Sequence, residues 1–145
     1  HLSLRRQRQM CIRDRSKSIE DGWTPLISTS RRTPEYLKKE ISKIVVNYPH
    51  YFYNSEGENP YYAFLGISDI AIVTPDSVNM VSEAITANLS TYIFDLKCKS
   101  KRINKFLSKL KNENLIKKID GEIKKFEFKE INATKEIANH LVKLI

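Results

Sequence analysis

The stretch from Ile70 to Ala84 constrains the fold of this chain more than any other segment. Its first four residues, Ile-Ala-Ile-Val, form a short run rich in β-branched side chains, which is typical of a strand buried inside a parallel sheet. A Thr-Pro pair ends that strand, and Asp76 or Ser77 can cap the helix that follows. The carboxyl end of a parallel strand, beside a helix N-terminus, is where open α/β sheets bind ligands. The segment therefore predicts both a fold class and the position of a binding site.

The rest of the chain alternates between strand patterns and helix patterns. Short apolar or aromatic runs predict strands at residues 25–30, 51–53, 70–73 and 91–94. Apolar residues spaced three and four apart predict helices that begin near residues 35, 61, 76, 103 and 131. The lysine-rich residues 115–130 are expected to form a loop with a short extended piece at 126–128. This alternation predicts an α/β fold with a Rossmann-like parallel sheet, right-handed crossovers and helices on both faces.

Residues 1–15 lack the pattern of a folded segment. They contain five arginines against one aspartate, in a chain whose net charge is +8, and show no sustained helical or strand period. They resemble the translated sequencing-adapter remnants found at the ends of some gene models. We interpret them as an artefact or a disordered arm, with a targeting peptide as the alternative. Residues 16–145 are expected to form one Rossmann-like domain of a longer protein, truncated on its amino-terminal side.

Cysteine content and hydropathy limit the compartment and the partners. Two cysteines cannot build a disulfide framework or a cysteine-based metal motif, which indicates a reducing compartment. No apolar run approaches the ~18 residues that span a bilayer. We expect a cytoplasmic protein, with peripheral contact with the inner membrane through Lys97 to Lys125 as an open alternative. Nucleic acid is not an expected partner, because aromatic residues are not interleaved among these lysines as a stacking platform requires.

Three polar corners follow the predicted strand ends, and in a parallel sheet they meet at one edge. The first corner consists of Ser30, Arg31, Arg32 and Thr33. Two arginines beside a capping hydroxyl at a helix start predict a clamp for a diphosphate, since guanidinium offers a planar fork to phosphate oxygens. The alternative is a solvated arginine pair that binds nothing.

The second and third corners supply the other candidate ligand-binding residues. The second corner, Gly57 to Pro60, contributes Asn59; the third corner and the helix that follows it contribute Thr74, Asp76, Ser77, Met80 and Glu83. Glu83 lies two turns into the helix, where its carboxylate could reach a pair of ligand hydroxyls. The alternatives are helix capping by the Asn, Asp and Ser side chains, core packing for Met80 and a surface position for Glu83. No glycine-rich phosphate loop and no metal-ligand spacing is present, so neither a metal nor a cofactor is expected.

The corner segments resemble the mitochondrial-fission ELM family, a bacterial and plant family related to GT-B glycosyltransferases. The matching pieces are Ser30 to Thr33, Gly57 to Tyr61, Leu65 to Asp69 and Val73 to Ala84. The resemblance implies the Rossmann-like carboxyl-terminal half of a two-domain GT-B-like protein, without its amino-terminal acceptor domain. One departure is Asn88-Leu-Ser-Thr91, where the family usually has a turn of the Gly-Lys-Pro type.

The resemblance also implies a ligand and a role for each corner. A nucleotide-diphosphate sugar would place its diphosphate at the first and third corners and its ribose at Glu83, with Asn59 and Met80 on the nucleoside side. We therefore expect the donor-binding half of a glycosyltransferase of cell-envelope glycan synthesis, inactive as this fragment alone and with no catalytic residue assigned. The alternative that the family raises is a non-enzymatic membrane-surface adaptor of the mitochondrial-fission type.

Overall fold

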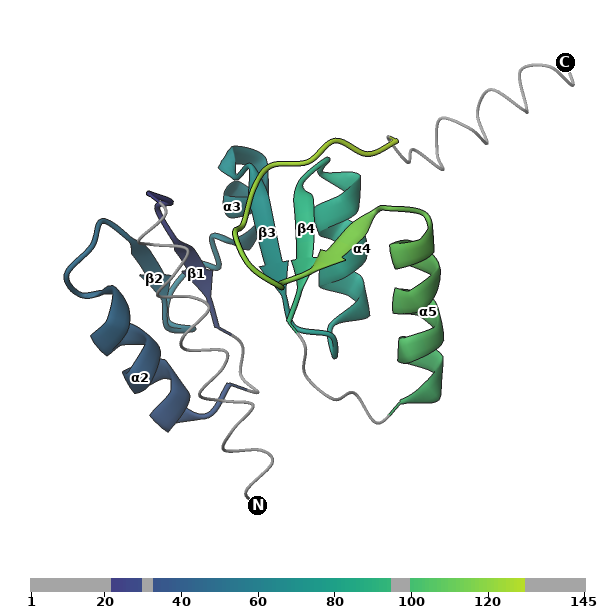
Figure 1. Ribbon diagram of the computed structural model, residues 1–145. Helices are drawn as coiled ribbons and strands as arrows, with labels where there is room; N and C mark the ends of the chain where they lie inside the picture. Colours follow the sequence, from purple (N-terminus) through teal and green to yellow (C-terminus); the bar gives the residue numbers. More distant parts are fainter. Residues whose placement is uncertain (1–21, 30–32, 95–99, 130–145) are drawn as a thin grey trace, which may run out of the picture.

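A computed structural model describes residues 22–29, 33–94 and 100–129, in which strands and helices alternate along the chain (Figure 1). The strands are β1 (Leu26–Ser28), β2 (Tyr51–Tyr53), β3 (Ile70–Val73), β4 (Ser90–Ile93) and β5 (Ile116–Lys118). The helices are α2 (Glu35–Val45), α3 (Tyr61–Ile67), α4 (Val78–Thr86) and α5 (Lys101–Asn112). The helix predicted to begin near residue 131 lies outside the described residues.

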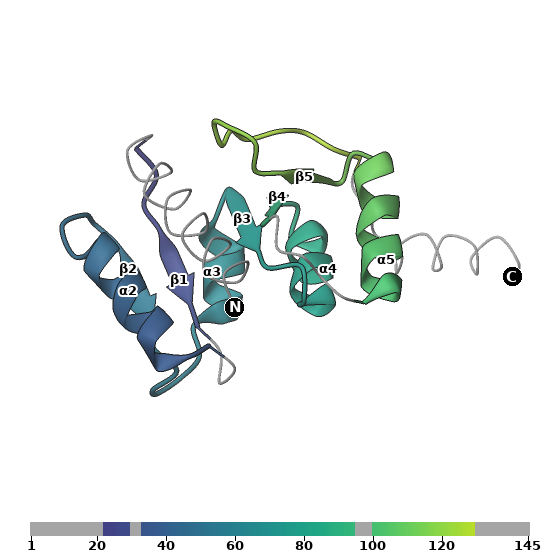
Figure 2. The ribbon, with the colours of Figure 1, turned by 60° about the horizontal axis from the view of Figure 1, so that its bottom comes forward.

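All the strand pairs in this part of the chain are parallel. Strand β1 pairs with β2, and β4 pairs with both β3 and β5. Figures 1 and 2 show α2 beside the β1–β2 pair, and α4 and α5 beside the β3–β4–β5 sheet. The predicted α/β class is therefore confirmed: parallel sheets are flanked by helices, as in a Rossmann-like fold.

The strands do not form one continuous sheet, which corrects the expectation of a single sheet. Among the described residues, β1 and β3 are not hydrogen-bonded to each other, and the strands divide into a two-stranded and a three-stranded sheet. Instead of pairing, the two strands share cavities: Ile27 of β1 and Ile72 of β3 both line the same two of them.

The core lies between the three-stranded sheet and helices α4 and α5. Val81, Ala84 and Ile85 of α4 are spaced three and four residues apart, so they share one face of the helix. That face is buried against Val73 of β3 and Ile93 of β4, and Val81 has no exposed surface. Burial of this cluster fixes α4 on the sheet, and its first turn therefore lies at the carboxyl end of β3.

The turn between α4 and β4 depends on Asn88. This residue has a φ of +61°, in the left-handed region, and the N–H of Leu89 closes the helix by donating to the carbonyl of Ala84 at 3.0 Å. Glycine is the usual residue in this conformation, and asparagine is the residue that replaces it most readily. Asn88, in the segment where the sequence departs from the turn expected for the family, therefore adopts a conformation that suits the end of a helix.

The segment that follows α5 holds more structure than its lysine-rich sequence predicted. Residues 116–118, which were expected to lie in a loop, form strand β5, because Ile116 is buried while the next two lysines remain exposed. The chain then crosses the sheet in an extended form. The Ser90 hydroxyl donates to the carbonyl of Phe126 and accepts from its N–H, both at 2.8 Å, and the Tyr92 hydroxyl does the same with Lys124 at 2.8 and 3.2 Å. Two side chains of β4 thus take the place of a neighbouring strand for residues 124–126.

Candidate functional site

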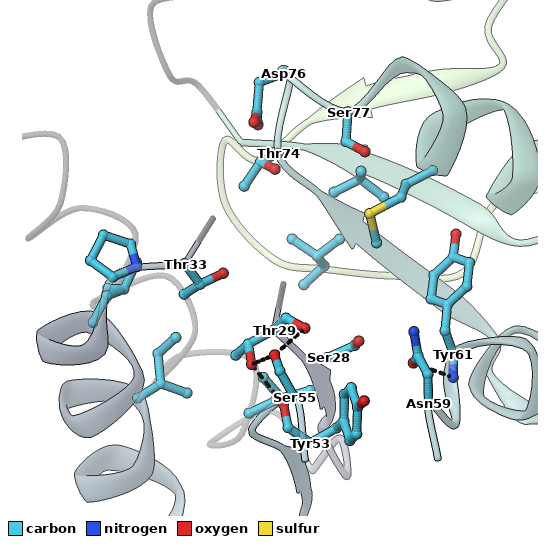
Figure 3. Close-up of a pocket in the computed structure, with 17 residues that line it drawn as sticks. Ser28, Thr29, Thr33, Tyr53, Ser55, Asn59, Tyr61, Thr74, Asp76 and Ser77 are labelled. Carbon is cyan, nitrogen blue, oxygen red and sulfur yellow. Dashed lines mark hydrogen bonds between the residues drawn. The ribbon is translucent and has the colours of Figure 1, made fainter. Parts of the chain in front are cut away.

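A cavity of about 610 Å³ lies where the carboxyl ends of β1, β2 and β3 face the first turns of α2, α3 and α4 (Figure 3). Its wall includes Thr29 after β1, Ser55 after β2 and Thr74 after β3. This is the edge of a parallel sheet at which ligands bind in open α/β folds. The volume falls within the range of small-molecule binding sites, roughly 300–1,000 Å³.

Most of the predicted ligand-binding residues that the structure describes meet in this cavity. Its lining includes Thr33, Asn59, Thr74, Asp76, Ser77 and Met80. The three corners, which are far apart in the sequence, therefore face one space, as their positions after parallel strands predicted. Ser30, Arg31 and Arg32 lie outside the described residues. Glu83 does not line the cavity, although a residue in contact with it does.

Two helix N-termini face the cavity. The wall includes Leu37 in the first turn of α2, Thr33 and Pro34 directly before that helix, and Asp76 and Ser77 directly before α4. The first N–H groups of a helix have no partner within the helix and carry a partial positive charge. Two such ends at one cavity favour an anionic group between them.

The capping of these two helices differs from the prediction. Pro34, not Thr33, occupies the N-cap position of α2, with a φ of −62° and a ψ of 143°. The proline ring fixes that φ, and an extended residue directly before the first helical turn is an N-cap by geometry, so the cap moves one residue along the chain. Ser77 is the N-cap of α4, but its side chain makes no capping hydrogen bond. The Ser77 hydroxyl is therefore not committed to its own helix end.

The lower part of the wall in Figure 3 is a hydroxyl network that the sequence analysis missed. The Thr29 hydroxyl donates to the carbonyl of Tyr53 at 2.8 Å and lies 3.2 Å from the Ser55 hydroxyl. Ser55 in turn donates to the carbonyl of Thr29 at 3.1 Å. These bonds join the ends of β1 and β2. Thr29 directly follows β1 and Ser55 lies two residues after the end of β2, so both lie near strand ends, as Thr74 does.

Asn59 and Tyr61 form the right side of the wall in Figure 3. Oδ1 of Asn59 accepts a hydrogen bond from the N–H of Tyr61 at 3.1 Å, but Pro60 occupies the N-cap position of α3 and no side chain caps that helix, so the predicted capping role of Asn59 is not found. The Tyr61 hydroxyl, also missed by the sequence analysis, donates to Oε2 of Glu83 at 2.7 Å. Burial of the phenol, and then the Glu83 carboxylate, raise the pKa of Tyr61 well above its ordinary value, so its proton is retained at neutral pH.

Among the described residues, the lining of the cavity carries little formal charge. Asp76 is the only lining residue with a formal charge among these positions, and the other polar groups are hydroxyls and the Asn59 amide. No group of His, Cys, Asp and Glu side chains among the described residues could hold a metal ion. Positive charge near the described wall therefore comes from the helix N-termini, not from lysine or arginine.

The cavity wall also has an apolar part. Leu37 and Ile41 of α2 and Ile72 of β3 contribute to it, together with Met80 of α4. Met80 also packs against the core cluster, so the packing role considered for it is present alongside its place at the cavity. A ligand with one anionic end and one planar or apolar end matches this division of the wall.

Comparison with known proteins found a family model and a relative that carry the same description. The family model with the description Mitochondrial fission ELM1 matches residues 3–145, a range that includes most of the segment 1–15 that we interpret as an artefact. The Mitochondrial fission protein ELM1 of Arabidopsis thaliana is 26% identical over 119 residues, which cover 79% of this chain and 28% of that protein. The chain thus spans less than a third of the length of that relative. No solved structure matches this chain.

Proposed function

The chain belongs to the mitochondrial fission ELM1 family, and from that premise we propose that its cavity binds the diphosphate and nucleoside of a nucleotide-diphosphate sugar. The observation that supports the proposal most is the meeting of two helix N-termini with hydroxyl groups from three strand ends. A diphosphate carries the negative charge that helix N-termini favour and the acceptor oxygens that hydroxyl groups need.

The diphosphate is proposed to lie between α2 and α4. Thr33, Thr74 and Ser77 supply hydroxyl donors there, and Arg31 and Arg32 of the first corner supply the full positive charges. Asp76 faces the same space. Its carboxylate repels phosphate but accepts from sugar hydroxyls, so within this proposal it marks the sugar side of the diphosphate.

The nucleoside is proposed to lie along the wall formed by Asn59, Tyr61 and Met80. An amide, a tyrosine ring and a thioether together offer hydrogen bonds and a flat apolar contact for a ribose and a base. Glu83 does not line the cavity and takes part through Tyr61, because its carboxylate accepts a hydrogen bond from the phenol.

The activity that this binding would serve is glycosyl transfer of the GT-B type in cell-envelope glycan synthesis, with the chain as the donor-binding half. Helix N–H groups and Arg31 would stabilise the negative charge that develops on the leaving nucleotide diphosphate. The acceptor and any general base would be bound by the other half of the cleft, so the chain alone is proposed to be inactive. The proposal includes a cytoplasmic location, peripheral on the inner membrane.

The second candidate is a non-enzymatic adaptor at a membrane surface. The relative's name refers to mitochondrial fission, and an adaptor needs a membrane contact but no ligand in the cavity. None of the helices that the structure describes is both long and apolar enough to cross a bilayer. Ligand titration separates the two candidates, because only the first requires binding in the cavity.

Titration calorimetry tests the first candidate with the 145-residue chain and with a full-length homologue. The titrants are a panel of nucleoside diphosphates and nucleotide-diphosphate sugars. At least one nucleotide is expected to bind, and Ser77→Ala is expected to weaken it roughly tenfold, since a hydrogen bond to a charged group is lost. Ser108→Ala, at an exposed serine of α5, is the matched control and is expected to leave affinity unchanged. Absence of binding to every titrant by both proteins rules the proposal out.

A further inference from the structure

Helix α5 carries positive charge with no negative charge of its own. Its exposed basic residues are Lys101, Arg102, Lys105, Lys109 and Lys111, and the sequence from Lys101 to Asn112 contains neither Asp nor Glu. Strand β5 adds two more exposed lysines directly after it. Together these seven side chains define the α5–β5 basic surface. Within this surface, Nζ of Lys109 lies 3.9 Å from the carboxylate of Glu113.

The placement of these charges opposes the stability of the helix. Lys101 and Arg102 lie in the first turn of α5, where the helix dipole favours acidic residues. Lys105 is spaced four residues from both Lys101 and Lys109, so like charges are neighbours on the helix surface. A face selected only for solubility usually mixes both signs of charge. The surface therefore keeps an arrangement that the helix itself disfavours.

Helix α2 shows the ordinary arrangement in the same molecule. Its first turn holds Glu35 and its last turn holds Lys43, as the dipole favours. Lys38 pairs with Glu35 and Lys43 pairs with Glu40, each at 2.7 Å. The contrast shows that α2 balances its basic residues with acidic ones, whereas α5 does not.

The α5–β5 basic surface lies at the outer edge of the molecule. Phe106, Leu107 and Leu110 of α5 pack toward the core, so the basic side chains of the helix are left facing outward. Figures 1 and 2 both place α5 at the far side of the three-stranded sheet from α2. None of the seven basic residues lines the large cavity, so a partner on this surface leaves the cavity open.

We propose that the α5–β5 basic surface binds the anionic headgroups of a lipid bilayer. Lysines near a negatively charged membrane each add attraction that falls off within a Debye length. The exposed large apolar residues that the structure describes lie on other elements, so nothing apolar on this surface inserts among the acyl chains. The contact is electrostatic adsorption, reversible by salt, and it does not depend on ligand binding in the cavity.

A nucleic acid is the other polyanion that such a surface could attract. Binding of single strands without sequence preference combines cations with exposed aromatic rings on which bases stack. The aromatic ring of α5 belongs to Phe106, which packs against the core, and Lys117 of β5 places its Nζ 4.3 Å from the centre of the Phe126 ring. A lysine-dominated surface without free rings fits a diffuse sheet of headgroups better than a base-stacking ligand.

Vesicle co-sedimentation of the 145-residue chain tests the proposal. Vesicles of phosphatidylcholine mixed with phosphatidylserine are expected to bind the chain at low salt, and pure phosphatidylcholine vesicles are not. The variant Lys101→Gln with Lys105→Gln is expected to lower the partition coefficient by roughly 25-fold, since one basic residue near an anionic surface contributes about fivefold. The control Lys39→Gln with Lys43→Gln removes the same charge from α2 and is expected to change binding far less.

Folding of the variant is checked by its denaturation midpoint, which is expected to stay equal or to rise, because like-charge repulsion is relieved. If that variant fails to fold, Lys109→Gln with Lys111→Gln on the same helix serves instead. Three results overturn the proposal: no binding to anionic vesicles at low salt, equal losses for the α5 and α2 variants, or tighter retention by single-stranded RNA than by the vesicles at equal ionic strength.

Discussion

The Tyr61 hydroxyl donates a 2.7 Å hydrogen bond to Oε2 of Glu83, which joins the first turn of α3 to α4 beside the cavity. Tyr61 lines the cavity and Glu83 does not, so the tyrosine lies between the carboxylate and the proposed ligand. We therefore propose that Tyr61 takes part of the role that the sequence analysis assigned to Glu83, direct contact with ribose hydroxyls. A phenol that donates to a carboxylate is also a better acceptor, so it offers a ligand hydroxyl a partner.

Removing this hydrogen bond should destabilise the protein modestly. Tyr61→Phe keeps the ring but leaves the Glu83 carboxylate without its phenol partner, and we expect a loss of about 1 kcal/mol in the free energy of unfolding, because both groups keep some access to water. Urea denaturation followed by circular dichroism measures the loss. Tyr62→Phe, at the exposed neighbouring tyrosine, is the control, and a loss of equal size there would show that the bond contributes nothing of its own.

The same contact predicts a loss of stability at alkaline pH. The pKa of Tyr61 is raised by burial and by Glu83, so the folded protein holds this proton more tightly than the unfolded chain. The stability that comes from this raised pKa is fully present below the tyrosine pKa of the unfolded chain, about 10, and is lost as the pH rises above that value. Denaturation midpoints measured across this range should fall more steeply for the parent chain than for Tyr61→Phe. Parallel curves would contradict the prediction.

The extended segment over the sheet depends on Ser90. Its buried hydroxyl makes two hydrogen bonds of 2.8 Å to the backbone of Phe126, and 2% of the residue is exposed. Ser90→Ala leaves both backbone groups without this partner, and we expect a cost of roughly 2 kcal/mol in unfolding free energy. Limited proteolysis should show faster cleavage near Phe126 in the variant. Ser82→Ala, at a helix serine of α4 that bonds only its own helix, should not accelerate that cleavage.

Asn88 gives a test of backbone conformation alone. Its φ of +61° strains a residue with an ordinary Cβ, so Asn88→Ala should cost about 1 kcal/mol, whereas Asn88→Gly should be neutral or stabilising. Chemical denaturation of the pair measures the difference. Equal stabilities for the alanine and glycine variants would show that the turn is not held in the left-handed conformation.

The sequence predicted the elements around the third corner because several signals agree there. A β-branched run, a Thr-Pro stop and the residues before Val78 all point to a strand followed by a helix, and the structure has β3 and α4 at those positions. Because residues that follow parallel strands meet at one edge of a sheet, the sequence also predicted that Asn59 and Thr33 lie near Ser77, and all three line the cavity. Agreement of local signals is what makes such a segment predictable.

Features that depend on contacts between distant segments could not be predicted in the same way. Strand β5 has one buried residue, Ile116, followed by two exposed lysines, so its sequence lacks the apolar pattern that predicts a strand. The separation of β1 from β3 leaves no local signal, because each strand alone has the pattern of a sheet member. Tyr61 looked like an ordinary aromatic residue of a short helix, since its hydrogen bond to Glu83 spans 22 positions.

The central claim, that a nucleotide diphosphate lies between the first turns of α2 and α4, is tested most directly by amide NMR. On titration of the 145-residue chain with the nucleotide that binds in calorimetry, the amide signals of residues 35–37 and 78–80 should shift first and most. The amides of α5 should stay in place. Saturable binding whose largest shifts lie on α5, or anywhere other than the two helix N-termini, would contradict the account.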